Sequence, residues 1–304
     1  MNVLQPITIT DAMLGASTSL AEDSTAAWVS GATYSVGDER HVVATHRVYR
    51  DSVGGVSSTT PQNDPVRWVD MRPTNRWAPF DFYTSTAATS TTSNIVYQIA
   101  ARFVNAIAIY GVVGANYNIT VKDQAGGAVI WQRSGVLRRH DKGWYNYLFG
   151  SRIQVRRLIF FGIPIRPTAE VTITISAGAG ATRAIGLIAM GKLRPLQGGF
   201  IGGSEKGATV EPVSYSYIKT DPDGVTTIVK RHSGTNLRAR VFIDQKQANA
   251  ALNILQDVLD VPCAWIVSEE DGYQGLSTFG IASSGPIQYE TPHAYIDISV
   301  KGLI

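Results

Sequence analysis

The side chains that could carry out acid–base or metal chemistry are scattered along the chain. The two nearest histidines, His41 and His46, are five residues apart, and no cysteine or carboxylate completes a set of metal ligands with them. Adjacent acids occur at Glu269-Glu270-Asp271, but this group precedes Gly272 in a predicted hairpin turn, where acids are commonly solvated. No Gly-x-Ser-x-Gly nucleophile elbow is present. We therefore predict that the protein is not an enzyme and holds no metal and no cofactor.

Two further groups favour structural roles over chemical ones. Cys263, the single cysteine, lies in an apolar run that predicts a strand, so we expect a buried thiol and no internal disulfide. The acids Asp221 and Asp223 are typical of calcium loops, but Pro222 and the absence of further spaced ligands favour a plain turn.

Aromatic residues near the start of the chain form the one pattern that suggests a ligand. Trp28 is followed by Tyr34, Gly37-Asp38, Tyr49, a proline-containing loop and Trp68. In this order, residues 26–71 resemble the small carbohydrate-binding modules of the type 5/12, chitin-binding-like class. The aromatic rings of such modules stack on the apolar faces of sugars. The resemblance therefore implies Trp28, Tyr49, Tyr34 and Trp68 as carbohydrate-binding residues.

The same aromatics could instead fill the core of so small a module. Modules of this class usually carry adjacent aromatics just after the position matched by Tyr49, whereas this chain has Arg50-Asp51-Ser52. We expect Tyr34 and Trp68 in the core, and both interpretations stay open for Trp28 and Tyr49.

Basic residues gather in the middle of a chain whose formal net charge is only +3. Residues 131–170 contain seven arginines and one lysine, with only Asp141 and Glu170 as acids. Such a segment could contact nucleic acid or an acidic glycan, but it lacks the aromatic interleaving of known nucleic-acid motifs. We favour a protein–protein interface, or simply outward-facing positions of strands, and expect no nucleic-acid partner. The interface candidates are Arg138, Arg139, Arg152, Arg156 and Arg157.

The composition, rich in threonine, serine, glycine, valine and isoleucine, predicts a mainly β fold in three segments. Residues 1–75 contain the small β module. Residues 76–197 carry seven or more short strands, such as the cleanly alternating 170–175, and predict a jelly-roll-like β-sandwich. After a glycine-rich hinge at 198–203, residues 198–304 predict an α+β domain. Its one helix, over residues 245–259, is capped by Asp244 and stopped by Pro262.

A second resemblance spans most of the chain. It lies in the order of 107–110, 118–123, 144–149, 186–191 and the ending at 295–303. This order resembles a group of tailed-bacteriophage tail or baseplate proteins, in which a carbohydrate-binding-like module precedes a β-sandwich and a final α+β domain. The resemblance implies a structural virion protein of the tail tip, baseplate or collar. Its partners would be other tail or baseplate proteins, copies of itself and host cell-surface polysaccharide.

The start of the chain fits this expectation. No basic segment followed by a long apolar stretch occurs there, so we predict no signal peptide, synthesis in the host cytoplasm and a final location in the virion tail. No window approaches the roughly twenty apolar residues of a membrane span, and we expect no membrane insertion. Two alternatives stay open: a carbohydrate-binding adhesin for host attachment, and a cell-wall-degrading enzyme anchored by the module.

Overall fold

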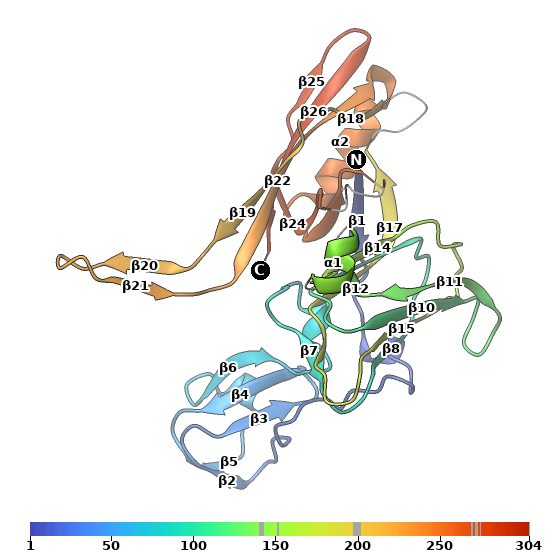
Figure 1. Cartoon of the computed structure of the whole chain (residues 1–304). Coiled ribbons are helices and arrows are strands. Elements are labelled where there is room, and N and C mark those ends of the chain that lie inside the picture. Colours follow the sequence, from blue (N-terminus) through green and yellow to red (C-terminus); the bar gives the residue numbers. More distant parts are fainter. Residues whose placement is uncertain are drawn as a thin grey trace.

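The computed structural model describes residues 1–139, 143–150, 152–196, 202–268, 270, 273 and 275–303. Strands make up 48% of the chain and helical turns 10% (Figure 1). The predicted fold class is confirmed: the chain is mainly β, with a small N-terminal module, a central sandwich and one helix near the C-terminus.

One large antiparallel sheet forms the frame of the molecule. It draws strands from all three predicted segments, so it crosses the position of the expected glycine hinge, of which residues 198–201 lie outside the described residues. Its order is β14 (Arg157–Phe160), β9 (Ala106–Tyr110), β17 (Leu187–Pro195), β1 (Asn2–Pro6), β23 (Cys263–Ile266), β24 (Ser277–Ser284), β26 (His293–Gly302), β22 (Ser233–Asp244) and β18 (Gly202–Ser204), with β19 (Thr209–Ser214) on β22 and β25 (Ile287–Tyr289) on β26.

The short strand β1 joins the two halves of this sheet. It pairs with β17 on one side, from Asn2 opposite Pro195 to Pro6 opposite Gly191, and with β23 on the other. Because neighbouring side chains of a strand point to opposite faces, Val3 packs into the C-terminal core while Leu4 packs against the other face. Both side chains are fully buried.

The sandwich forms where a second sheet packs on β14, β9 and β17. Its order is β11 (Val129–Val136), β10 (Asn116–Lys122), β15 (Glu170–Ser176) and β8 (Ile95–Ala100). In β15 the predicted alternation is present, since Val171, Ile173 and Ile175 are buried and the threonines between them are partly exposed. These side chains meet Ile107 and Ile109 of β9 in one core, as expected for two facing sheets.

On its other face the large sheet curls back on itself. The side chains inside the curl combine alanines with large residues: Ala106 and Ala108 of β9 lie in one cluster with Ala264 of β23 and Phe279 of β24. Arg157 of β14 closes the curl: its guanidinium donates to the carbonyl oxygens of Ser277 at 2.8 Å and Gly275 at 3.4 Å. Alanine side chains allow the close backbone approach that this curl requires.

The C-terminal half packs the predicted helix on the large sheet. Asp244 accepts a hydrogen bond from the Lys246 N–H at 3.0 Å and starts a 3-10 turn, η4 (Gln245–Gln247), which continues into α2 (Ala248–Val258). Ala251, Leu255 and Val258 are buried on the face toward the sheet. Among the described residues, no helix combines the length and apolar character needed to cross a membrane.

The N-terminal module is a separate small β structure (Figure 1). It has a three-stranded sheet, β3 (Glu39–Val42), β4 (Arg47–Asp51) and β6 (Trp68–Pro73), and a pair, β2 (Ala32–Tyr34) and β5 (Gly55–Ser57).

The remaining elements are short and lie outside the two main sheets. They are η1 (Asp11–Met13), η2 (Pro61–Asn63), η3 (Ala78–Phe80), β7 (Ala88–Ser90) with β16 (Arg183–Ile185), β12 (Arg138–Arg139) with β13 (Ile153–Gln154), β20 (Tyr217–Thr220) with β21 (Thr226–Val229), and α1 (Trp144–Phe149).

The entry and exit of the module are tied together by the carboxylates of Asp23, which is buried, and Glu22, which is partly exposed. Asp23 accepts two hydrogen bonds from Arg72, at 2.7 and 3.0 Å, and one from the Asn75 N–H at 2.9 Å. Glu22 accepts a hydrogen bond from the Thr74 hydroxyl at 2.8 Å. The chain therefore enters and leaves the module at one point.

Truncating the strand that joins the halves of the sheet should weaken the whole fold. We expect Leu4→Ala to lower the free energy of unfolding by about 2–5 kcal/mol, because it leaves a cavity between β17 and β23. The matched variant Leu252→Ala, on the exposed side of α2, should change it by about 0.5 kcal/mol or less. Chemical denaturation measures both, and equal losses would contradict this role of β1.

Candidate binding and assembly surfaces

Three of the four aromatics named as sugar-binding candidates lie in the core of the module. The exposed fractions are 5% for Tyr34, 6% for Tyr49 and 2% for Trp68. Tyr34 meets Trp68 edge to face with ring centroids 5.3 Å apart, and its hydroxyl donates to the Val29 carbonyl at 2.8 Å. The burial of Tyr34 and Trp68 agrees with their expected place in the core. Tyr49, left open between core and ligand, joins them there.

Trp28 is the one member of this set that keeps a partly exposed ring. It packs against the same cluster, and its indole N–H donates to the Ser57 hydroxyl at 3.4 Å. The exposed apolar side chains of the module are mostly valines, such as Val36, Val56 and Val66, which have no flat ring for a sugar to stack on. Among these candidates, only the Trp28 ring could therefore stack on a bound sugar.

The residues that replace the usual adjacent aromatics form an ion-paired turn. Asp51 is fully buried and accepts hydrogen bonds from the Arg67 guanidinium at 2.7 and 3.0 Å. Its other oxygen accepts from the N–H groups of Val53 and Gly54, both at 2.9 Å. Burial alone would raise the pKa of Asp51, but the hydrogen bonds from Arg67 and the two amides outweigh it and hold this pKa below the ordinary carboxyl value. Asp51 therefore stabilises the turn at residues 52–54, at the place where modules of the type 5/12 class usually carry aromatic residues.

Four of the five interface arginines lie on or beside one hairpin. Arg138 and Arg139 form β12, opposite Gln154 and Ile153 of β13, and Arg152 and Arg156 flank β13. All four are exposed, and no carboxylate of the described residues forms an ion pair with them. The fifth, Arg157, is half-buried and closes the curl of the large sheet, so its guanidinium is engaged within the chain.

The same hairpin carries a helix that the sequence pattern did not predict. In α1, the exposed fractions are 75% for Trp144, 62% for Tyr145, 62% for Leu148 and 70% for Phe149. Tyr145 and Phe149 contact one another with centroids 5.3 Å apart. We call these four residues, with the four exposed arginines, the α1 patch. The signal in the sequence was the close spacing of apolar residues after Gly143, which would have indicated a helical turn.

A second exposed apolar element projects from the sheet as a two-stranded hairpin, residues 215–231, which we call the arm (Figure 1). Every residue of β20 and β21 is exposed, including Ile218 and Ile228, each 64% exposed. At its tip the Asp221 N–H donates to the Val225 carbonyl at 2.9 Å, and Gly224 takes a positive φ of 82°. The segment read as a turn is therefore a turn, at the end of the arm.

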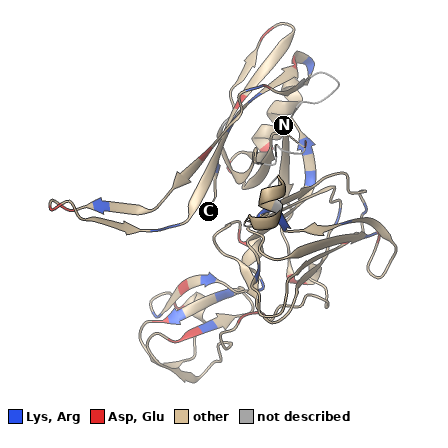
Figure 2. Cartoon of the chain, viewed as in Figure 1, with Lys and Arg blue, Asp and Glu red and all other residues tan. Residues whose placement is uncertain are grey.

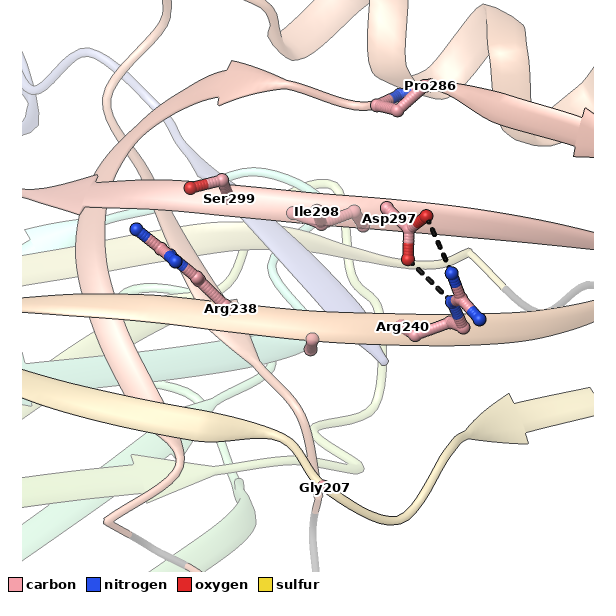
Figure 3. A pocket seen from close by; sticks show the side chains of 8 residues that line it. Gly207, Arg238, Arg240, Pro286, Asp297, Ile298 and Ser299 are labelled. Carbon is pink, nitrogen blue, oxygen red and sulfur yellow. Dashed lines mark hydrogen bonds and ion pairs between the residues drawn. The ribbon is translucent and has the colours of Figure 1, made fainter.

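A shallow groove of about 400 Å³ lies on the surface of β22 and β26 (Figure 3). Arg240 and Asp297 face one another across the strands, with two hydrogen bonds of 2.7 and 3.1 Å. Hydrogen bonding to Arg240 lowers the pKa of Asp297, so this pair is ionised and mutually neutralised at neutral pH. Arg238 and Ser299 complete the polar lining of this groove.

The other side chains that could be reactive or bind a metal make contacts that stabilise the fold. Cys263 is fully buried, and burial raises the pKa of its thiol to about 12, which disfavours the reactive thiolate. His46 lies between Asp11 and Glu22, at 3.1 and 2.9 Å, and stacks on Trp77. In the part of the chain that the structure describes, no three His, Cys, Asp or Glu side chains gather as a metal site. Most of the acidic turn at 269–272 and His140 lie outside the described residues.

No protein-family model, no curated protein and no solved structure matches this chain. Function is therefore inferred from the surfaces described above and from the order of segments in the sequence.

Removing the buried carboxylate of the module should unfold it more readily than removing an exposed one. Asp51→Ala leaves Arg67 and two amides without their acceptor, whereas Asp70→Ala breaks a surface pair with Arg47 worth about 1 kcal/mol or less. We expect a clearly lower denaturant midpoint for Asp51→Ala than for Asp70→Ala. Equal midpoints would show that the buried pair does not hold the module.

Acidification should weaken the module through the same residue. Because folding lowers the pKa of Asp51, its ionised form contributes stability above about pH 4, and this contribution is lost as the pH falls through the lowered value. Asp51→Asn should therefore lose less stability than the wild-type chain between pH 5 and strongly acidic conditions. Indole signals of Trp28 and Trp68 in NMR spectra follow the module, and identical acid profiles for the two proteins would contradict the assignment.

Proposed function

We propose that this protein is a non-catalytic structural subunit of a bacteriophage tail, at the tail tip, baseplate or collar, assembling through protein–protein contacts. The observation that carries the proposal is the pair of exposed apolar elements, the arm and the α1 patch. Exposed hairpins and grouped aromatics are costly in water and are typical of surfaces that another protein covers. The order of module, sandwich and α+β domain, which resembles tail and baseplate proteins, supports the phage setting.

The second role in this proposal is contact with host surface glycan through the N-terminal module. The partly exposed ring of Trp28 supports it, and also supports the alternative that the protein is primarily a carbohydrate-binding adhesin. The burial of Tyr34, Tyr49 and Trp68 favours assembly over adhesion as the main role. The groove at Arg240 and Asp297 lends no support to a cell-wall-degrading enzyme.

A tail subunit should be present in the finished particle. We expect mass spectrometry of purified virions to detect this chain in several copies relative to a single-copy tail protein. We also expect antibody labelling to place it on the tail in electron micrographs. Its absence from purified virions, with the major capsid protein readily detected in the same sample, would overturn the proposal.

If the module contacts glycan, Trp28 is the residue that should matter. We expect Trp28→Ala to reduce binding to insoluble host polysaccharide or chitin by about tenfold or more while the module stays folded, because one stacked ring is lost. Val36→Ala, an exposed aliphatic change in the same module, serves as the control. Unchanged binding by Trp28→Ala would remove the glycan role, and its unfolding would show that Trp28 is a core residue.

A further inference from the structure

A pocket of about 350 Å³ opens where the curled sheet closes on itself, at the base of the arm. Its walls come from the loop before β7, from the end of β9 and from the first residues of β14, β22 and β24. Among the described residues that line it, Arg156, Arg157 and His232 are basic and none is acidic. The described lining therefore carries two permanent positive charges and no negative one.

Hydrogen bonds hold one of these two charges in place. The Arg157 guanidinium donates to the Ser277 carbonyl at 2.8 Å and to the Thr235 hydroxyl at 3.4 Å. Both acceptors are neutral, so they position the side chain without cancelling its charge. Arg156 is exposed beside it, and no hydrogen bond or ion pair engages its side chain in the described part of the chain. The pocket thus combines a fixed guanidinium with a second one that is available to an anion.

The basic residues of the N-terminal module are arranged differently. There, basic and acidic residues lie side by side on neighbouring strands (Figure 2). Arg47 pairs with Asp70 at 2.9 Å, and Arg50 pairs with Glu39 at 2.7 Å, so these charges are balanced within the module. The arginines of the pocket form no such pair with any carboxylate of the described residues. An anionic ligand would supply the counter-charge that the pocket lacks.

The rest of the lining suits a ligand with hydroxyl groups on a compact ring. Thr84 and Ser233 contribute hydroxyl groups, which can both donate and accept hydrogen bonds. Tyr110 and Phe279 contribute aromatic rings whose centroids are 6.1 Å apart, and such rings pack on the apolar faces of sugars. The volume lies at the lower end of the range for small-molecule pockets, so one sugar unit fits better than a long chain.

We propose that this pocket binds an acidic sugar, with the anionic group of the sugar at Arg156 and Arg157 and its ring against Phe279. The shared chemistry is one carboxylate or phosphate on a hydroxylated ring. The site goes beyond the glycan contact proposed for the N-terminal module, because it lies on the large sheet and does not involve Trp28. Binding here also requires no second subunit.

Isothermal titration calorimetry of the purified chain tests the proposal with glucuronic acid, glucose 6-phosphate, glucose and inorganic phosphate as probes. We expect at least one of the two acidic sugars to bind with a Kd of about 1 mM or tighter, and about tenfold or more tighter than glucose or phosphate. The acidic sugar that binds more tightly identifies the anionic group. Equal affinity for glucose, equal affinity for phosphate, or no binding of either acidic sugar would each overturn the inference.

Two arginine variants locate the site. Arg156→Gln should lower the affinity for the acidic sugar about tenfold or more, because a charge-assisted contact is lost. Arg152→Gln changes another exposed arginine that does not line the pocket, and it should leave the affinity unchanged. Circular dichroism verifies that both exposed changes leave the fold intact. Equal losses in the two variants would show a general charge effect and would overturn the inference.

A third variant separates this site from the N-terminal module. Trp28→Ala should bind the acidic sugar as the wild type does, whatever its effect on insoluble polysaccharide. If Trp28→Ala lost the acidic sugar while Arg156→Gln kept it, the sugar would belong to the module and the inference would be wrong. These assays use purified protein, so their outcome is independent of whether virions contain the chain.

Discussion

The structure depends on the antiparallel pairing of β1 with β17 and β23. In the described part of the chain, the sandwich side and the helix side of the large sheet are joined by strand pairing only through this strand. One face of β1 supplies Val3 to the C-terminal core, and the other supplies Leu4 to the inside of the curl. Five residues therefore connect two cores and two sets of strands. The arm leaves from β19 and β22 on one side of this connection, and the α1 patch lies on the sandwich side.

The curl beside β1 shows how packing decides what a charged residue does. Alanines at 106, 108, 189 and 264 leave room for the sheet to fold back, and Phe279 fills the space between them. Arg157 then bridges from β14 to the carbonyls of β24. In sequence it is one of several neighbouring arginines, but its strand position turns it inward, while Arg138 and Arg139 on a two-residue strand point to solvent. One arginine thus makes hydrogen bonds within the fold, whereas the others remain exposed on the surface.

Local patterns predicted the parts of the fold that local physics determines. The alternation of Glu170–Ser176 and the amphipathic run of α2 each bury one face, so composition and periodicity are sufficient. The role of β1 depends on its pairing with β17, nearly 200 residues away in the sequence, and with β23, about 260 residues away. A local sequence pattern cannot reveal pairing over such separations. Among the candidate ligand residues, the structure buries Tyr49 and leaves Trp28 partly exposed, a difference that depends on how the strands of the module pack and not on residue type. The ion pair of Asp51 was not predictable from its local sequence, because its partner Arg67 lies 16 residues further on, in the turn before β6. The exposure of the arm and the helix α1 were not predicted, because exposed apolar residues cannot be told from core residues by residue type alone.

The hydrogen bonds of Asp23 with Arg72 and Asn75 affect how such a chain can change in evolution, because they join the two ends of the module. Since the module begins and ends at one point and contributes no strand to the large sheet, it is attached as a cassette. A recombination event that replaced everything between Glu22 and Asn75 would leave β1, the sandwich and the helix with all of their pairings. The module can thus be exchanged as a unit while the contacts of the remaining fold stay intact, so changes within the module and changes in the large sheet are structurally independent of one another.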